Sequence, residues 1–312
     1  MVVAFGVFST IHPGQIVNAF DTISASYIQS LHNAGIKVVL SLGGALTSLP
    51  NTSVDFHSVL SQAASPAAFQ DTFVQSVQSF MTQYGFDGID IDIEHGFGAG
   101  GTFANPTGDI GVMAKIINQL RQLNPSILIT LAPQSPNISA TRGFDSIWGN
   151  YSSLVMQTAP ALTWVGIQLY NSGCNFGIDL VCYDPNNVSS PNFSVAMAVD
   201  LLSSWPAQLA NGQATGFQPY ISRLNANQVV LGYPSPNAQG ASDGSPVTSV
   251  AVIKKAMQCL KTGLAADCGT YVPPRAYGMV GGVFNWEVSF DESANYQFAR
   301  GLRECAVNGI CK

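Results

Sequence analysis

Three carboxylates alternate with isoleucines in one short segment of the 312-residue chain, which reads DGIDIDIE from Asp87 to Glu94. In a β-strand, alternate side chains point to opposite faces, so Asp90, Asp92 and Glu94 are expected in file on one face. Same-face neighbours stand roughly 6.6 Å apart, and like charges so close raise the proton affinity of some members. Because a fold has little structural use for that cost, the file indicates a functional site.

Two other interpretations of the file are weighed against this one. An exposed edge strand with polar outer positions would also alternate, but the isoleucines and the preceding Gly88 are typical of a central strand. A metal site is the second, because hard cations take oxygen ligands. The His or further carboxylates that would support a metal at other strand ends are not evident, so no metal is expected.

The elements that must position the file follow from the apolar pattern. Short runs rich in β-branched residues each predict a buried parallel strand. They are Val2 to Phe8, Ile36 to Leu42, Phe86 to Ile93, Ile127 to Leu131, Thr163 to Leu169, Val229 to Gly232 and Met279 to Phe284.

Helical patterns separate most of these strands. One carries apolar residues at three- and four-residue steps from Phe69 to Tyr84, with Ser65 and Pro66 as its start signal and Gly85 as its stop. Further helices are predicted over Ile110 to Leu123, Asn192 to Trp205, Val247 to Lys261 and Asp291 to Arg303. Strands alternating with helices favour an α/β fold, a closed (β/α)8 TIM barrel, and no linker divides the chain. We expect one catalytic domain over residues 1–312.

Composition excludes several functions. The chain is 46% hydrophobic and 10% charged, with a net charge of −6, so it offers no attraction for a nucleic-acid backbone. No run approaches the roughly 18 apolar residues of a membrane span, and we expect a soluble monomer without membrane contact. Neither a dinucleotide fingerprint nor a phosphate loop is present, so no cofactor is expected. A small or neutral ligand is favoured.

Cysteine spacing points to an oxidising compartment. Six cysteines form three close pairs, and local disulfides are favoured over free thiols, although six cysteines allow 15 pairings. N-x-S/T sequons agree with a secreted glycoprotein, although several will be chance matches. The chain begins MVVAFGVFST without a signal-peptide pattern, so we expect that a leader has been removed or that the sequence begins late. The cysteine pairs are Cys174 and Cys182, Cys259 and Cys268, Cys305 and Cys311; the sequons lie at Asn51, Asn137, Asn150, Asn187 and Asn192.

The acidic segment resembles glycoside hydrolase family 18, the chitinases, whose signature is DxxDxDxE at the end of the fourth barrel strand. Asp87, Asp90, Asp92 and Glu94 match it position for position, and Ser41-Leu42-Gly43-Gly44 upstream matches the SxGG motif of the third strand. Downstream, Gln168-Leu169-Tyr170-Asn171 is similar to the sixth-strand motif, and Trp286 falls where the family places its eighth-strand tryptophan. The similarity covers nearly the whole chain.

The resemblance implies a retaining mechanism in which the substrate's own 2-acetamido oxygen attacks the anomeric carbon, an exception to the two-carboxylate scheme. Glu94 would protonate the glycosidic oxygen and later activate water. Asp92 would bind the acetamido N–H, and the deeper Asp90 would share a proton with Asp92. Asp87 has the wrong parity for the file and is interpreted as structural. His95 points away from Glu94 by parity, so no catalytic role is expected for it.

The resemblance also supplies the substrate-binding set. Tyr170 would donate its hydroxyl to the acetamido carbonyl, and Gln168 or Asn171 would contact the sugar. Trp286 would form an apolar floor under the sugar. Gly43 and Gly44 are expected to allow tight backbone packing beneath the substrate. The alternatives are a core tryptophan at Trp286, a buried, backbone-bonded tyrosine at Tyr170, and purely structural roles for Gln168 and Asn171.

The sequence departs from the family pattern in two ways. Only one strand-like run precedes the SxGG strand, so the first barrel strand is missing. We favour truncation over an unrecognised segment or an open barrel. The interval from Tyr233 to Met279 leaves no room for the α+β insertion of some members, which suggests a shallow cleft suited to endo cleavage.

A secreted chitinase is the favoured function, acting on β-1,4-linked N-acetylglucosamine in chitin or chitooligosaccharides. An endo-β-N-acetylglucosaminidase acting on N-glycans would need the same acetamido group. A non-catalytic chitin-binding barrel is disfavoured because the terminal acid Glu94 is retained, although the missing strand supports it. A small-molecule metal enzyme is the least favoured.

Overall fold

The computed structural model describes residues 1–18, 23–45, 55–98, 100–139, 151–206, 209–210, 213–214, 219–236 and 246–308. The chain divides into two compact units: unit 1 comprises Met1–Ala132 and Phe144–Thr163, and unit 2 comprises Pro133–Gly143 and Trp164–Lys312. That residues 1–312 form a single domain stays a prediction.

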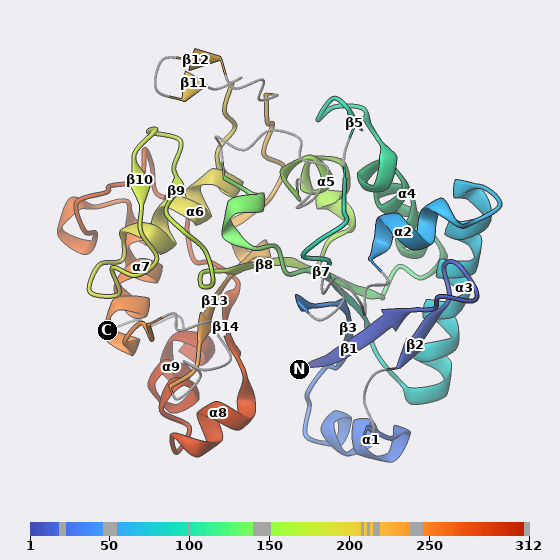
Figure 1. Cartoon of the computed structure of the whole chain (residues 1–312). Helices are drawn as coiled ribbons and strands as arrows, with labels where there is room; N and C mark the ends of the chain where they lie inside the picture. Colours follow the sequence, from blue (N-terminus) through green and yellow to red (C-terminus); the bar gives the residue numbers. More distant parts are fainter. Residues whose placement is uncertain are drawn as a thin grey trace. The chain divides into compact units, whose positions relative to one another are not determined.

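Unit 1 is built on a sheet of five strands in the order β7-β4-β3-β1-β2 (Figure 1). β1 (Val2–Phe8), β3 (Val39–Gly43), β4 (Gly88–Asp92) and β7 (Leu128–Leu131) run parallel, and β2 (Ile16–Asn18) pairs antiparallel with β1. Because β4 pairs with β3 on one side and with β7 on the other, the interpretation of the acidic segment as an exposed edge strand is wrong.

Helices connect the strands of this sheet, and the predicted limits of one of these helices are confirmed. α3 (Pro66–Tyr84) begins after Ser65, whose hydroxyl accepts from the Ala68 amide, and ends at Gly85 in the left-handed conformation, φ 85°. Phe69, Phe73 and Val77 on its inner face are fully buried. The other helices of unit 1 are α1 (Ala25–Asn33), α2 (Phe56–Ser61), α4 (Gly108–Leu123) and α5 (Tyr151–Thr158); β5 (Gly100–Gly101) and β6 (Pro106–Thr107) pair before α4.

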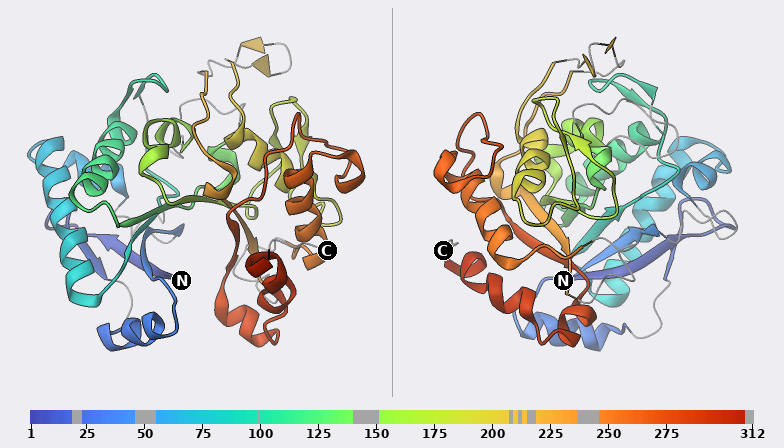
Figure 2. Two further views of the ribbon diagram at one scale, coloured as in Figure 1. Left: turned by 180° about the vertical axis from the view of Figure 1, so that it is seen from behind. Right: turned by 60° about the vertical axis from the view of Figure 1, so that its left-hand side comes forward.

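Unit 2 is built on three parallel strands, β8 (Trp164–Gln168), β13 (Val229–Pro234) and β14 (Gly282–Trp286). α6 (Asn192–Leu202) contacts β13 and α9 (Gln297–Asn308) contacts β14, as the views of Figure 2 allow the reader to follow. α7 (Val250–Thr262) packs on both helices, and α8 (Val288–Ser293) precedes α9. Two hairpins complete the unit: β9 (Asn175–Phe176) with β10 (Cys182–Tyr183), and β11 (Leu209–Ala210) with β12 (Gln213–Ala214).

The single helix predicted from Asp291 to Arg303 is wrong, because two helices occupy this stretch. α8 ends before Asn295 and Tyr296, which adopt left-handed φ values of 57° and 56°. The buried carboxylate of Asp291 then accepts the backbone amides of Phe298 and Ala299 at 2.9 and 3.1 Å, and so caps the first turn of α9. Apolar periodicity runs through this break and does not reveal it.

All seven strands predicted from apolar runs are present; β1 has the predicted bounds, and the bounds of the other six are shifted by a few residues. Among the described residues, one parallel strand, β1, precedes the β3 strand that carries Ser41 to Gly43. The described part of the chain holds no helix both long and apolar enough to cross a bilayer.

The disulfide prediction is confirmed for two of the three pairs, Cys174–Cys182 and Cys259–Cys268. Cys311 of the third pair lies outside the described residues. Among the sequons, the Asn137 side chain is only 1% exposed, so that this sequon fits a chance match, whereas Asn187 is exposed. Asn51 and Asn150 also lie outside the described residues.

Candidate active site

The carboxylate file lies at the carboxyl end of β4 in unit 1. Asp90 and Asp92 are 2% and 7% exposed, and Glu94, two residues beyond the end of the strand, is half-buried. Exposure therefore rises along the file, in the order that the sequence predicts for a site opening beyond the strand end. The isoleucines between the carboxylates, Ile89, Ile91 and Ile93, are all buried.

Asp90 is held by one hydroxyl from each neighbouring strand. Parallel register places Ser41 of β3 and Thr130 of β7 opposite Asp90. Ser41 donates to Oδ2 at 2.8 Å and Thr130 donates to Oδ1 at 2.6 Å. Burial raises the pKa of Asp90, and the two hydroxyl bonds partly offset that rise because they favour the ionised form. The deepest carboxylate is thus fixed in orientation and binds its proton tightly.

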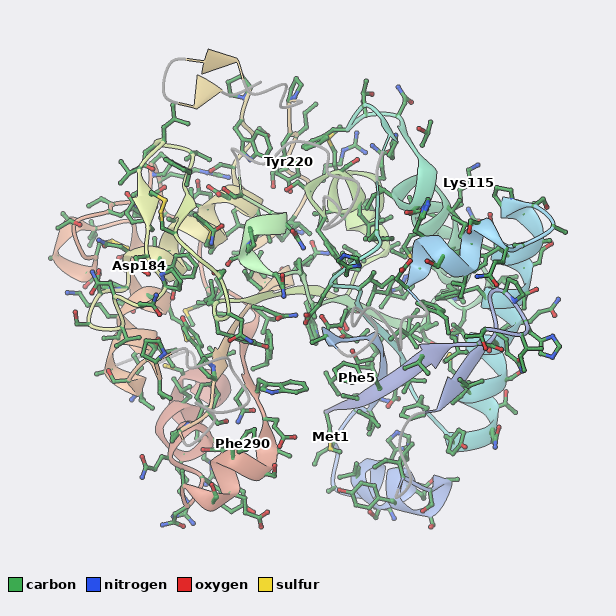
Figure 3. The ribbon with its side chains drawn as sticks, in the orientation of Figure 1. Met1, Phe5, Lys115, Asp184, Tyr220 and Phe290 are labelled. Atoms are coloured by element: carbon green, nitrogen blue, oxygen red, sulfur yellow. A yellow bond between two sulfur atoms is a disulfide. The ribbon has the colours of Figure 1, made fainter. Side chains whose placement is uncertain are left out.

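Gly43 and Gly44 bring the end of β3 close to Asp92. The Gly44 amide donates to the Asp92 carbonyl at 2.6 Å. A Cβ at Gly43 would stand 2.4 Å from that same carbonyl oxygen, and a Cβ at Gly44 would stand 2.5 Å from the ring of Phe5, which is labelled on β1 in Figure 3. Both glycines have positive φ, 111° and 77°. Both glycines therefore allow tight packing, and that this packing lies beneath the substrate stays a prediction.

Tyr151, the first residue of α5, holds the chain between the last two carboxylates. Its phenol donates to the Ile93 carbonyl and accepts from the Ile93 amide, both at 2.9 Å. Burial first, and then the negative charge of Asp92, raise the pKa of Tyr151 well above its usual range, with smaller contributions from Asp90 and Glu94. All three carboxylates therefore act electrostatically on the one phenol of Tyr151.

The sixth-strand motif of unit 2 lies at the carboxyl end of β8. Gln168 and Tyr170 are 4% and 5% exposed, and Asn171 adopts a left-handed φ of 52°. The backbone amide of Gln168 donates to the Pro133 carbonyl at 2.9 Å, and the backbone amide of Leu169 donates to the Gly232 carbonyl at 3.0 Å. The backbone at the motif is thus bonded on both sides.

A buried polar cluster fixes the loop that follows this motif. The side-chain amide of Asn175 donates through Nδ2 to the Gly173 carbonyl at 3.0 Å and to the hydroxyls of Ser172 and Ser135, each at 3.2 Å. Ser135 and Ser172 are themselves bonded at 3.0 Å. The disulfide between Cys174 and Cys182 closes the same loop.

Trp286 is the last residue of β14 and is half-buried rather than part of the core. Its carbonyl accepts the Ser235 amide at 2.8 Å. Gln168, Phe284 and Trp286 share one face of the three strands, because register places Gly232 opposite both Gln168 and Phe284. Gly232 is needed there, since a Cβ would stand 2.0 Å from the Phe284 ring.

Three residues bonded at these positions, Thr130, Tyr151 and Asn175, are not predicted from the sequence. Thr130 lies on a correctly predicted strand. It is a polar residue inside an apolar run, which could have marked it as a site residue, and register places it opposite Asp90. Tyr151 carries no such signal, because it meets Ile93 only through the tertiary fold. Asn175 bonds Ser172 and Gly173 locally, and only its bond to Ser135 depends on the tertiary fold.

Two alternatives to this site are a metal site and a surface groove in unit 1. Among the described residues, His, Cys, Asp and Glu side chains nowhere gather in threes in a way that could hold a metal ion. A groove of about 750 Å³ in unit 1 runs between α3 and the turn that joins β1 to β2, and none of the predicted site residues lines it. We place the candidate site by the carboxylates rather than by this groove, because the groove's lining offers no acid.

Parallel strands alternating with helices, with carboxylates at the carboxyl end of a central strand, define the class of (β/α)-barrel enzymes. The sequence model of Glycosyl hydrolases family 18 matches residues 2–237, and the chain belongs to this family. Its fold class is therefore α/β, the (β/α)8 TIM barrel, as predicted.

Relatives agree with this assignment. The solved structure of the Legionella pneumophila ChiA C-terminal domain is 62% identical, with a TM-score of 0.93, and the match covers 100% of this chain and 92% of that one. Chitinase Chi52 of Paenibacillus xylanexedens is 30% identical over 91% of this chain and 51% of its own length. Chitinase D of Niallia circulans is 28% identical over 96% and 55%. The chain thus spans about half the length of these two relatives.

Proposed function

We propose that the chain hydrolyses β-1,4 linkages of N-acetylglucosamine in chitin and chitooligosaccharides, with retention of configuration and with Glu94 as general acid and base. The observation that carries this proposal is the file of Asp90, Asp92 and Glu94 at the end of β4, with its deepest member fixed by two hydroxyls. Family membership and the chitinases among the relatives support the substrate class.

The chemistry needs one acid at the leaving group. Glu94 gives its proton to the glycosidic oxygen while the acetamido oxygen of the same sugar attacks the anomeric carbon and the glycosidic bond breaks. The resulting oxazolinium ion is opened by water, whose proton returns to Glu94. Asp92 accepts a hydrogen bond from the acetamido N–H and stabilises the positive charge that develops on the acetamido group.

Asp90 supports Asp92 from below. Because its pKa is raised, Asp90 keeps its proton to higher pH than an exposed carboxyl does. A proton shared between Asp90 and Asp92 keeps the pair at a single negative charge, so that their titration belongs to the pair and not to either residue.

The residues of unit 2 contribute substrate contacts in this proposal. Tyr170 donates its hydroxyl to the acetamido carbonyl, Gln168 and Asn171 bind the sugar, and Trp286 offers its indole face to the apolar face of the pyranose ring. Half-burial of Trp286 leaves part of the indole accessible for such contact.

We also propose endo cleavage by a secreted monomer. Between Tyr233 and Met279 the described residues hold α7 and a short 3-10 turn, without a strand that could begin an α+β insertion. Two disulfides in the described residues favour an oxidising compartment. Endo action predicts mixed oligomers early in chitin digestion, whereas steady release of disaccharide from chain ends would contradict it.

The test of the substrate-assisted step compares two matched hexamers, β-1,4-linked N-acetylglucosamine and its fully deacetylated form. The proposal predicts cleavage of the acetylated hexamer alone, with the β-anomer as the first product by proton NMR. Equal cleavage of both hexamers, or a first product in the α-configuration, would overturn the mechanism.

A further inference from the structure

The four residues after Glu94 are tied to the first turns of two helices. The His57 amide of α2 donates to the Gly96 carbonyl at 2.9 Å. The Gly98 amide donates to Oδ2 of Asp109 at 2.8 Å, and the Ile110 amide of α4 donates back to the Gly98 carbonyl at 3.2 Å. This segment, residues 95–98, is called the acid loop below.

Packing fixes the middle of the acid loop. Phe97 is fully buried, with its ring 5.4 Å from that of Phe56 on one side and 5.4 Å from that of Tyr151 on the other. Gly96 has a φ of 63°, and a Cβ there would stand 2.5 Å from the carboxyl group of Asp55. The loop therefore has little room to move sideways.

Asp109 is an ionisable side chain that is bonded directly to the backbone of the acid loop. It is 4% exposed, and Nδ1 of His57 lies 3.1 Å from Oδ2 and 3.2 Å from Oδ1. Burial raises the pKa of Asp109, while the bonds from His57 and Gly98 act the other way. A buried carboxylate costs free energy unless its bonds are satisfied, and here one of those bonds ends on the acid loop.

We propose that Asp109 is a positioning residue for Glu94, holding the acid loop through the Gly98 amide while His57 holds Asp109. The inference rests on the proposed role of Glu94. The carboxyl group of Glu94 must meet the glycosidic oxygen within hydrogen-bond distance, and displacement of about 1 Å can cost on the order of 10²-fold in rate. Loss of the Asp109 anchor therefore lowers kcat, while substrate binding, which other residues provide, is retained.

The experiment uses Asp109→Ala, Asp109→Asn and, as a matched control, Asp87→Ala. Asp109→Asn keeps a carbonyl oxygen for the Gly98 amide and should rescue most of the loss. Asp87 is also an aspartate bonded to a histidine, His32 at 2.9 Å, and to Lys37 at 2.8 Å, but it is half-buried and lies immediately before β4, at the end of the strand opposite to Glu94.

We expect Asp109→Ala to lower kcat on the acetylated hexamer about 10- to 100-fold, with KM changed less than threefold, when both are measured well below the melting temperature of the variant. The same substitution should speed hydrogen exchange at the backbone amides from Glu94 to Gly98. Asp87→Ala should lower the melting temperature without changing kcat. Unchanged kcat, or a loss confined to KM, in Asp109→Ala would overturn the inference, as would equal kcat losses in Asp87→Ala.

Hydrogen exchange separates this inference from the proposed function. If the parent chain does not hydrolyse the hexamer while Asp109→Ala still loosens the acid loop, the proposed function fails and the catalytic part of the inference fails with it. If the parent is active and the loop amides of Asp109→Ala exchange as slowly as those of the parent, the proposed function stands and Asp109 is not the anchor.

Discussion

Thr130 of β7 donates its hydroxyl to Oδ1 of Asp90 across 2.6 Å. The bond follows from register alone, because parallel pairing sets the two residues opposite each other on one face. Its consequence is electrostatic: a hydroxyl aimed at a buried carboxylate stabilises the ionised form and opposes the effect of burial on the pKa of Asp90.

Replacing Thr130 with valine should lower stability in a pH-dependent way. The folded pKa of Asp90 is raised above the unfolded value, so folded chains bind this proton more tightly, and stability falls as pH rises from about 4 through the folded pKa. Thr130→Val raises the folded pKa further. We expect a loss of about 1–3 kcal/mol in the free energy of unfolding at neutral pH, shrinking at acidic pH where Asp90 is protonated in both states.

Thr158→Val is the matched control for urea unfolding across this pH range. Thr158 is also fully buried in unit 1, and its hydroxyl donates to the Leu154 carbonyl at 2.7 Å, with no carboxylate involved. Its stability loss should not vary with pH. If the Thr130→Val loss were equally constant, the hydroxyl would not be controlling the proton affinity of Asp90.

Replacing Tyr151 with phenylalanine removes both hydrogen bonds to Ile93 and leaves a buried amide and a buried carbonyl with one partner fewer. We expect a loss of about 2–4 kcal/mol in the free energy of unfolding. Because Ile93 lies between Asp92 and Glu94, kcat should also fall by about 10-fold or more. Steady-state kinetics at a temperature where the variant is fully folded measures this effect.

Tyr220→Phe gives the comparison for Tyr151. Tyr220 of unit 2, labelled in Figure 3, is equally buried and donates its hydroxyl to the Leu201 carbonyl at 2.9 Å. Its loss should cost stability and leave kcat unchanged. Equal kcat values for the parent and Tyr151→Phe would show that the phenol supports the fold alone.

The two disulfides offer a matched pair, with sequence separations of 8 and 9 residues. Removing either one by paired Cys→Ser changes should cost at most about 2–3 kcal/mol through the entropy of the unfolded chain. Only loss of Cys174–Cys182, which closes the loop after Tyr170 and Asn171, should also raise KM for the acetylated hexamer severalfold. The same KM in both double variants would argue that this loop does not position substrate contacts.

Local signals in the sequence predicted the strands and α3 well. Ser65, Pro66 and Gly85 act within one turn of the helix ends, so the fold has little power to override them. The break between α8 and α9 was not predicted, because it depends on left-handed Asn295 and Tyr296 and on two amides bonded to Asp291. Neither residue is a glycine, and the helical pattern continues through both.

The part of the candidate site that lies within one strand could be predicted from the alternation of residues along that strand. Period-two alternation was enough to set Asp90 and Asp92 on one face of β4. The groups bonded to this segment come from other elements: Thr130 of β7 bonds Asp90, Tyr151 of α5 bonds Ile93, and Asp109 of α4 bonds Gly98 beyond the file. Their partners are distant in the sequence, so spacing along the chain contains no record of these contacts.

The most direct measurement is hydrolysis of the acetylated hexamer by the parent chain and by Glu94→Gln, with binding of the hexamer recorded for both. Removal of a general acid predicts a loss of about 10²- to 10⁴-fold in kcat with the dissociation constant of the hexamer changed less than threefold. Cleavage by Glu94→Gln at the parent's rate would contradict the account, because some other group would then protonate the glycosidic oxygen.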